Sequence, residues 1–168
     1  MKKLFLLLLT VVLVSCDDEN NIDQTQATIS AEFSSEKFVG NKVAYKVNEV
    51  IKLGVSNKQL LNSFNNYSEK LELGKKALSL QMEEINGKNY IRFHNEDMSV
   101  STVALINTTK NGSQNNNQIM SIGVTVCTSV ACANCCGCIP DGSYCSLCNL
   151  SVPDCKRTTS DGPPEGSF

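Results

Sequence analysis

Apolar and polar residues alternate with a period of two in several short segments, which predicts β-strands with one face exposed to water. Residues 28–34 and 42–47 show this alternation, and residues 99–106 and 119–126 form a further predicted strand pair. The segment between that pair, residues 107–117, holds five asparagines and no aliphatic side chain. We interpret it as the solvated loop of a long hairpin, with a recognition loop as the alternative.

A second hairpin is predicted around Asn86-Gly87, a dipeptide that accepts the positive φ angles of a tight turn. Residues 78–83 alternate before this turn, and residues 90–94 return after it. The first arm also fits a helical spacing and contains good helix formers, so a helix is the alternative there. Gly74 before the arm and the Asn-Gly turn after it favour the strand.

One helix is predicted from Ser56, because Ser56 and Gln59 match a capping box, in which each side chain hydrogen-bonds the backbone N–H of the other residue. Apolar side chains then recur at a helical spacing, at Leu60, Phe64, Tyr67 and Leu71. Gly74 is expected to end this helix. Residues 28–126 are therefore predicted to form an α+β domain, a small antiparallel sheet with one packed helix, followed by a cysteine-rich module.

The chain begins with an apolar leader. Lys2 and Lys3 precede residues 4–14, an apolar run broken only by Thr10. At about 1.5 Å per residue, this run is too short to cross the roughly 30 Å of hydrocarbon in a bilayer as a helix. A short positive start followed by such a run is typical of an export signal.

The leader ends in Leu13-Val14-Ser15-Cys16, which resembles the lipobox of bacterial lipoproteins in each of its four positions. The resemblance covers only the first 16 residues of the chain. It implies that residues 1–15 are a signal peptide and that Cys16 becomes the acylated N-terminus of the mature protein. Two or more acyl chains at this residue would hold the protein stably on a membrane.

Residues 16–27 are predicted to be the lipidated cysteine and an acidic tether, because Asp17-Asp18-Glu19 follows the motif. An acidic run at this place is similar to the surface-export signals of some Gram-negative lipoproteins, whereas an aspartate beside the lipidated cysteine is similar to an inner-membrane retention signal. As a flexible coil the tether would span on the order of 18 Å. The predicted location is the bacterial cell envelope, with the outer membrane or cell surface favoured.

Eight of the nine cysteines lie within residues 127–155, at Cys127, Cys132, Cys135, Cys136, Cys138, Cys145, Cys148 and Cys155. The apolar side chains between them are too few to offset the entropy of ordering this module, so covalent bridges or metal bonds are required. An exported chain meets an oxidising compartment, which favours disulfides for all eight. The spacing leaves the pairing open, except that Cys135 and Cys136 are expected to have different partners.

Three alternatives to structural disulfides remain. Cys132, Cys135, Cys145 and Cys148 form two Cys-x2-Cys pairs with the spacing of a zinc site, which makes zinc the alternative cofactor. The same pairs are candidates for thiol–disulfide exchange, although no helix is predicted after either pair to stabilise a thiolate. An iron–sulfur cluster is disfavoured, because Gly142 stands where a ferredoxin motif has its fourth cysteine.

Charge and composition narrow the classes of function. Removal of the leader takes Lys2 and Lys3 from the 15 basic residues and leaves the 17 acidic ones, a formal net charge of −4. The sequence has no basic patch and no tryptophan, so nucleic acid is not an expected partner. His94 is the only histidine and no G-x-S-x-G motif accompanies it, so we expect a solvated surface residue. Residues 156–168 are predicted to be a disordered tail.

These observations predict an exported, lipid-anchored protein with a binding or structural role. We expect no catalytic residue and no cofactor. The membrane is the expected partner through the lipid at Cys16, and an unidentified protein or surface ligand is a further candidate. An envelope thiol-redox or zinc-binding protein is the alternative function.

Overall fold

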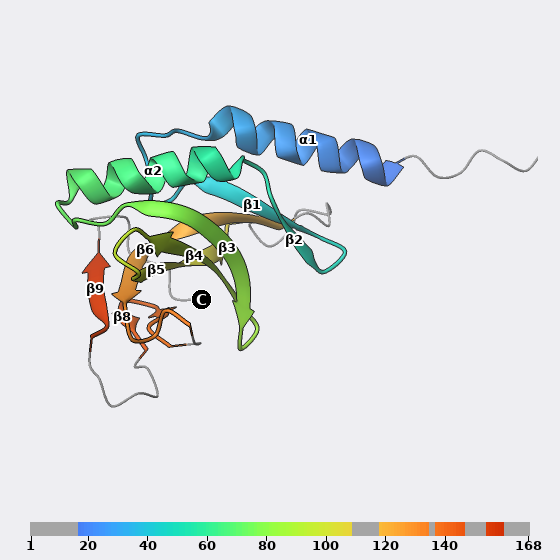
Figure 1. The fold of residues 1–168 in the computed structure, drawn as a ribbon. Coiled ribbons are helices and arrows are strands. Elements are labelled where there is room, and N and C mark those ends of the chain that lie inside the picture. Colours follow the sequence, from blue (N-terminus) through green and yellow to red (C-terminus); the bar gives the residue numbers. More distant parts are fainter. Residues whose placement is uncertain (1–16, 109–117, 135–136, 147–153, 160–168) are drawn as a thin grey trace, which may run out of the picture.

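The computed structural model describes residues 17–108, 118–134, 137–146 and 154–159 (Figure 1). Among these residues, one antiparallel sheet has seven strands: β1 Lys42–Val47, β2 Val50–Leu53, β3 Ala77–Ile85, β4 Lys88–Asn95, β5 Val100–Asn107, β6 Gln118–Ser129 and β9 Lys156–Thr159. The strand order is β2-β1-β6-β5-β4-β3. Strand β9 pairs with the second half of β6, and β1 pairs with the first half. The sheet curves into a half-barrel.

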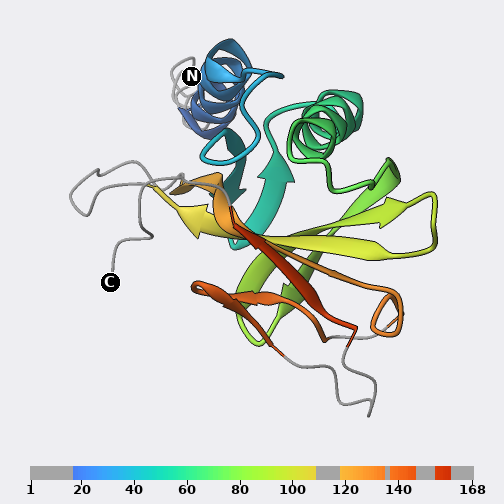
Figure 2. The same cartoon turned by 90° about the vertical axis from the view of Figure 1, so that its left-hand side faces the viewer.

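Two helices, α1 Asp17–Glu32 and α2 Asn57–Lys70, cover one face of this sheet (Figure 2). The main hydrophobic core lies between the helices and the sheet, and its centre is aromatic. Phe64 of α2 stacks on Phe93 of β4 with ring centroids 4.4 Å apart, and Phe38, from the segment between α1 and β1, contacts both rings. Burial of these rings removes a large apolar area from water and holds α2 against the sheet.

The C-terminal cysteine-rich module covers the opposite face of the sheet and includes a short hairpin of β7 Pro140–Asp141 and β8 Tyr144–Cys145 (Figure 2). Successive residues of a strand point to opposite faces. In β4, Phe93 therefore lies in the main core, while the buried Arg92 hydrogen-bonds the main chain of Cys132 in the module. The fold thus has three layers: two helices, the sheet and the cysteine-rich module.

Several predicted elements are confirmed. The strand predicted at residues 42–47 is β1, and the pair predicted at residues 99–106 and 119–126 is β5 and β6. The hairpin predicted around Asn86-Gly87 consists of β3 and β4, with φ angles of 53° and 74° at the two turn residues. Strand rather than helix is therefore correct for the first arm of this hairpin.

Helix α2 begins with the predicted capping box. Ser56 Oγ accepts a hydrogen bond from the Gln59 N–H at 3.3 Å, and Gln59 Oε1 accepts one from the Ser56 N–H at 3.0 Å. The helix ends earlier than expected, because Glu72 already adopts the left-handed conformation, with φ of 52°, that usually falls to a glycine after a helix. Gly74 is thus not the residue that ends it.

Residues 28–34, predicted as a strand, lie in α1 and the turn after it, and the predicted coil at residues 17–27 is also helical. The prediction of a strand at residues 28–34 and the prediction of a coil at residues 17–27 were both wrong. An alternation of only a few residues is compatible with the period of a helix as well as with that of a strand. Ile22, Ile29 and Phe33 repeat at a helical spacing and pack against the main core. Among the described residues, two helices therefore pack on the sheet where the sequence predicted one.

Two strands of the seven-stranded sheet were missed by the sequence prediction. Strand β2 follows β1 through a turn at Asn48 and Glu49, both of which have positive φ. Strand β9 occupies the first part of residues 156–168, the predicted disordered tail, and residues 160–168 lie outside the described residues. Neither strand has a strong alternating pattern of its own, so each depends on the strand it pairs with.

The predicted boundary between the α+β domain and the cysteine-rich module falls within an element. Strand β6 runs through residues 126 and 127, so the sheet and the module share a strand. Residues 109–117, most of the predicted polar loop before β6, lie outside the described residues. The module is therefore built onto the sheet rather than attached after it.

Candidate functional site

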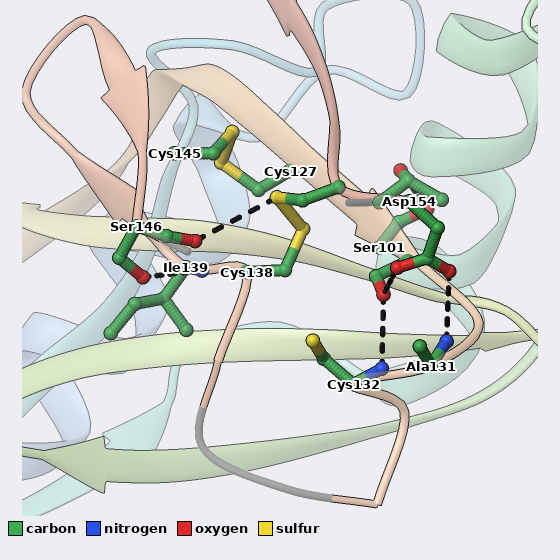
Figure 3. Close-up of a disulfide and its surroundings, with 12 residues drawn as sticks. Ser101, Cys127, Ala131, Cys132, Cys138, Ile139, Cys145, Ser146 and Asp154 are labelled. Atoms are coloured by element: carbon green, nitrogen blue, oxygen red, sulfur yellow. Dashed lines mark hydrogen bonds between the residues drawn. A yellow bond between two sulfur atoms is a disulfide. The ribbon is translucent and has the colours of Figure 1, made fainter. Parts of the chain in front are cut away.

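Two disulfides tie the cysteine-rich module to the sheet (Figure 3). Cys127 of β6 is bonded to Cys145 of β8, with Cα atoms 5.7 Å apart, and Cys138 is bonded to Cys155, which precedes β9, with Cα atoms 5.5 Å apart. The bonded residues are separated by 18 and 17 positions. In the chain-entropy model, closing a loop of this size contributes about 3 kcal/mol. The disulfide prediction is confirmed for these four cysteines.

Cys132 is also disulfide-bonded. The remaining cysteines, Cys16, Cys135, Cys136 and Cys148, lie outside the described residues. The different partners expected for the two adjacent cysteines therefore stay a prediction.

The alternative zinc site needs four thiolates, at Cys132, Cys135, Cys145 and Cys148. Two of them, Cys132 and Cys145, take part in disulfides, and a disulfide sulfur is not a thiolate. Across the described ranges, no group of three or more His, Cys, Asp or Glu side chains is placed to hold a metal ion. The disulfides and the zinc site therefore compete for the same sulfur atoms.

The sulfur atoms form a second small core under the sheet. Cys127, Cys132 and Cys138 are buried, and the partly buried Cys145 and Cys155 pack against them. Thiol–disulfide exchange requires a thiolate to reach a disulfide sulfur. In each described bridge one cysteine is buried and the other is only partly exposed, which favours a structural role for both bridges.

Asp154 holds the turn that follows β6 (Figure 3). One carboxylate oxygen accepts a hydrogen bond from Ser129 Oγ at 2.5 Å, and the other accepts from the N–H groups of Val130 at 2.7 Å and Ala131 at 2.8 Å. These hydrogen bonds lower the pKa of the Asp154 carboxyl, and the bond from Ser129 has the largest effect. Asp154, the residue directly before Cys155, therefore holds the turn that follows β6.

Arg92 connects the sheet to the same turn from the other side. Its side chain is 4% exposed. One guanidinium nitrogen donates to the carbonyl oxygens of Cys132 at 3.0 Å and Ala133 at 3.3 Å, and the other donates to Glu83 Oε2 at 3.1 Å. A planar guanidinium reaches these acceptors from two separate nitrogens, whereas a lysine would have to reach all of them from one. Arg92 thus positions the main chain of the module on the sheet.

A polar cluster connects the β7–β8 hairpin to the β3–β4 hairpin. Asp141 accepts hydrogen bonds from Lys88 Nζ at 2.9 Å and from Tyr144 Oη at 2.7 Å. The hydrogen bond from Lys88, followed by the one from Tyr144, lowers the pKa of the Asp141 carboxyl. These side chains are largely exposed, so their ion pair contributes little to stability. We infer that this cluster fixes the position of one hairpin turn relative to the other.

His94 lies on β4 and is partly buried.

Its neighbour Asn95 belongs to a buried polar network in which the Asn95 amide donates to Ser99 Oγ at 3.0 Å and to Ser101 Oγ at 2.9 Å. Ser101 Oγ in turn lies 2.8 Å from Thr128 Oγ1 on β6. This network joins the ends of β4, β5 and β6.

Acid should weaken the fold through Asp97. Hydrogen bonds from Lys75 and from Ser99 lower the pKa of the Asp97 carboxyl from 3.8 to about 2. A carboxyl whose pKa is lower in the folded state contributes stability above its unfolded pKa, and this contribution is lost as the pH falls through the folded pKa. Asp97→Asn should therefore lose less stability than the wild type between about pH 5 and about pH 2 in urea unfolding.

The matched control for this experiment is Glu96→Gln, which changes a neighbouring exposed carboxylate. It should keep the wild-type dependence of the unfolding free energy on pH. An Asp97→Asn protein with the same acid dependence as the wild type would contradict the prediction.

Sequence reasoning missed Arg92 and Asp154 as residues that position the module. Arg92 lies between Ile91 and Phe93 in the sequence. In a strand with one face buried and the other in water, this alternation would place Arg92 on the face in water. The signal that could have marked it is a charge in a strand whose two faces are both covered. Asp154 directly precedes Cys155, but its partners at residues 129–131 lie more than twenty positions earlier in the sequence.

Comparison of the chain with protein-family models, with curated proteins and with solved structures finds no match. In the part of the chain that the structure describes, neither helix is both long and apolar enough to cross a bilayer. The residues of this chain are therefore the basis on which its function is inferred.

Proposed function

We propose that this chain is an exported, lipid-anchored protein of the bacterial cell envelope with a binding or structural role. The observation that carries the proposal is that all five cysteines among the described residues are in disulfides, behind a leader that ends in a lipobox-like motif at Cys16. Stable structural disulfides are typical of exported proteins and rare in reducing cytosol. The oxidised module and the leader therefore both support an exported protein in an oxidising compartment.

A non-enzymatic role is supported by what the charged side chains in the module and on the sheet face beneath it contact. Arg92 and Asp154 use their charges on main-chain groups of this chain, and Asp141 uses its charge on Lys88 and Tyr144. Groups that are satisfied in this way stabilise a fold, whereas an acid–base catalyst must be free to reach a substrate.

Cys16→Ala tests the anchor. We expect the wild-type protein to sediment with membranes and to incorporate labelled palmitate, because acylation supplies two or more chains at Cys16. The variant should lose the label and leave the sedimented membrane fraction. Ser15→Ala is the matched control, since it keeps a small residue before the cysteine. Full retention of the Cys16→Ala protein in the membrane fraction would contradict the proposal.

The alternative, an envelope thiol-redox or zinc protein, makes a different prediction for Cys132, Cys135, Cys145 and Cys148. It requires free thiols or bound metal in the native protein. A structural module requires eight oxidised cysteines, which lowers the non-reduced intact mass by about 8 Da relative to the all-thiol chain. Zinc in the native mass together with the all-thiol denatured mass would favour the alternative.

A further inference from the structure

Helix α1 begins at Asp17, the residue that follows Cys16, and ends at Glu32. Its 16 residues extend about 24 Å at a rise of about 1.5 Å per residue. A flexible coil of the same residues would let its two ends approach and separate freely. A helix instead keeps its two ends at a fixed separation.

The C-terminal half of α1 is docked closely on the fold. Ile29 is fully buried in the main core, and a Cβ atom placed on Gly54 would lie 2.6 Å from Ile29 Cγ2. Ser30 Oγ also donates a hydrogen bond of 2.8 Å to the Gly54 carbonyl oxygen. The helix therefore approaches the chain at Gly54 more closely than a residue with a side chain would permit.

Contacts on both sides of Ile29 fix the rotation of α1 about its axis. Glu32 forms an ion pair of 2.7 Å with Lys42 of β1, and Gln26 Oε1 accepts a hydrogen bond from Tyr45 Oη at 3.5 Å. Two turns before Ile29, Ile22 also packs against the main core. The docked part of α1 thus spans residues 22–32.

We propose that α1 is a rigid spacer that sets the distance and orientation of the sheet relative to a membrane-held Cys16. The inference rests on the lipid attachment proposed above. Residues 17–21 belong to the same helix as the docked part, so α1 offers no coil that would absorb movement of the anchor. The N-terminus of α1 and strand β9 lie at opposite ends of the molecule (Figure 1), so β9 faces away from the membrane.

The test attaches the lipid chemically, so that it does not depend on acylation in the cell. The mature chain is joined through the Cys16 thiol to a maleimide lipid in phosphatidylcholine nanodiscs that also carry a gadolinium-chelate lipid. Relaxation of the backbone amide signals then reports the distance of each residue from the bilayer. We expect strong broadening near the start of α1, and a steep decrease toward β9.

Gln24→Pro interrupts the spacer, because proline breaks a helix interior. Gln24 is exposed, and the docked contacts that lie after it, from Gln26 to Glu32, stay in place. This variant should flatten the relaxation profile toward that of a chain with about six Gly-Ser residues inserted before Asp17, which add on the order of 13 Å of flexible reach. Gln24→Ala is the matched control and should keep the wild-type profile.

A second readout is amide hydrogen exchange in residues 18–28 of the nanodisc-bound wild type. We expect exchange at least about tenfold slower than in an unfolded chain, because the amides are hydrogen-bonded within α1. A wild-type relaxation profile equal to that of the Gly-Ser chain, or unprotected amides in this segment, would overturn the spacer and leave the lipid attachment at Cys16 standing. A Cys16→Ala protein that stays in cell membranes would instead overturn the proposed anchor, and with it the spacer role, whatever the relaxation profile of the chemically lipidated chain.

Discussion

Replacing Cys127 and Cys145 together with alanine should lower the free energy of unfolding by about 3 to 5 kcal/mol. The bridge closes a loop over 18 positions, which contributes about 3 kcal/mol in the chain-entropy model. Cys127 is also fully buried among the other sulfur atoms, so its truncation leaves unfilled volume in the second core. The measurement is urea unfolding of the purified variant under non-reducing conditions.

The matched variant removes the other described bridge, by Cys138→Ala together with Cys155→Ala. This bridge holds the residue before β9, so its loss should release β9 and expose the edge of β6 that it covers. Amide exchange should then rise first in residues 125–128 of β6 and in β9. A change in unfolding free energy below about 1 kcal/mol for the Cys127 and Cys145 pair would contradict the predicted contribution of this bridge to stability.

Arg92→Ala should lower the free energy of unfolding by about 3 kcal/mol, the second largest effect that we expect. The substitution leaves the carbonyl oxygens of Cys132 and Ala133 without the guanidinium that donates to them beneath the sheet. It also removes the alkyl part of a side chain that is almost fully buried. Urea unfolding gives the magnitude, and the yield of oxidative refolding reports whether the module still docks.

Two variants separate the contributions of Arg92. Glu83→Gln removes the charge of the ion-pair partner but keeps the carbonyl contacts, and it should cost about 1 kcal/mol, because Glu83 is partly exposed. Arg92→Lys keeps the charge but offers one nitrogen where the guanidinium uses two, so it cannot keep both the carbonyl contacts and the ion pair with Glu83, and its effect should fall between the other two. If Glu83→Gln costs as much as Arg92→Ala, the ion pair rather than the docking of the module explains the loss.

Local interactions explain where the sequence predicted the fold correctly. The capping box of Ser56 and Gln59 forms between residues three positions apart, and the Asn86-Gly87 turn needs only the φ angles of two adjacent residues. The alternating patterns of β1, β5 and β6 likewise identify strands from adjacent residues. Each of these signals is complete within a short segment, so it can be recognised without knowledge of the rest of the chain.

Distant partners explain where the sequence prediction failed. Helix α1 depends on Gly54, which lies 25 positions after Ile29 and leaves room for it. Strand β9 depends on β6 and on the bridge between Cys138 and Cys155. The burial of Arg92 depends on a turn about 40 positions later in the chain. In each case, the residues adjacent to the element do not reveal the distant partner that holds the element in place.

The capped helix, the Asn-Gly hairpin and the concentration of cysteines that calls for bridges can all be recognised in the sequence alone. The folded arrangement of the chain was needed to show that the cysteine-rich module covers the second face of the sheet, which cysteines of the described part are paired, and that α1 is a docked helix. The physical reason is that turn angles and capping bonds depend on adjacent residues, whereas burial of a sheet face depends on side chains that folding brings together from distant parts of the chain.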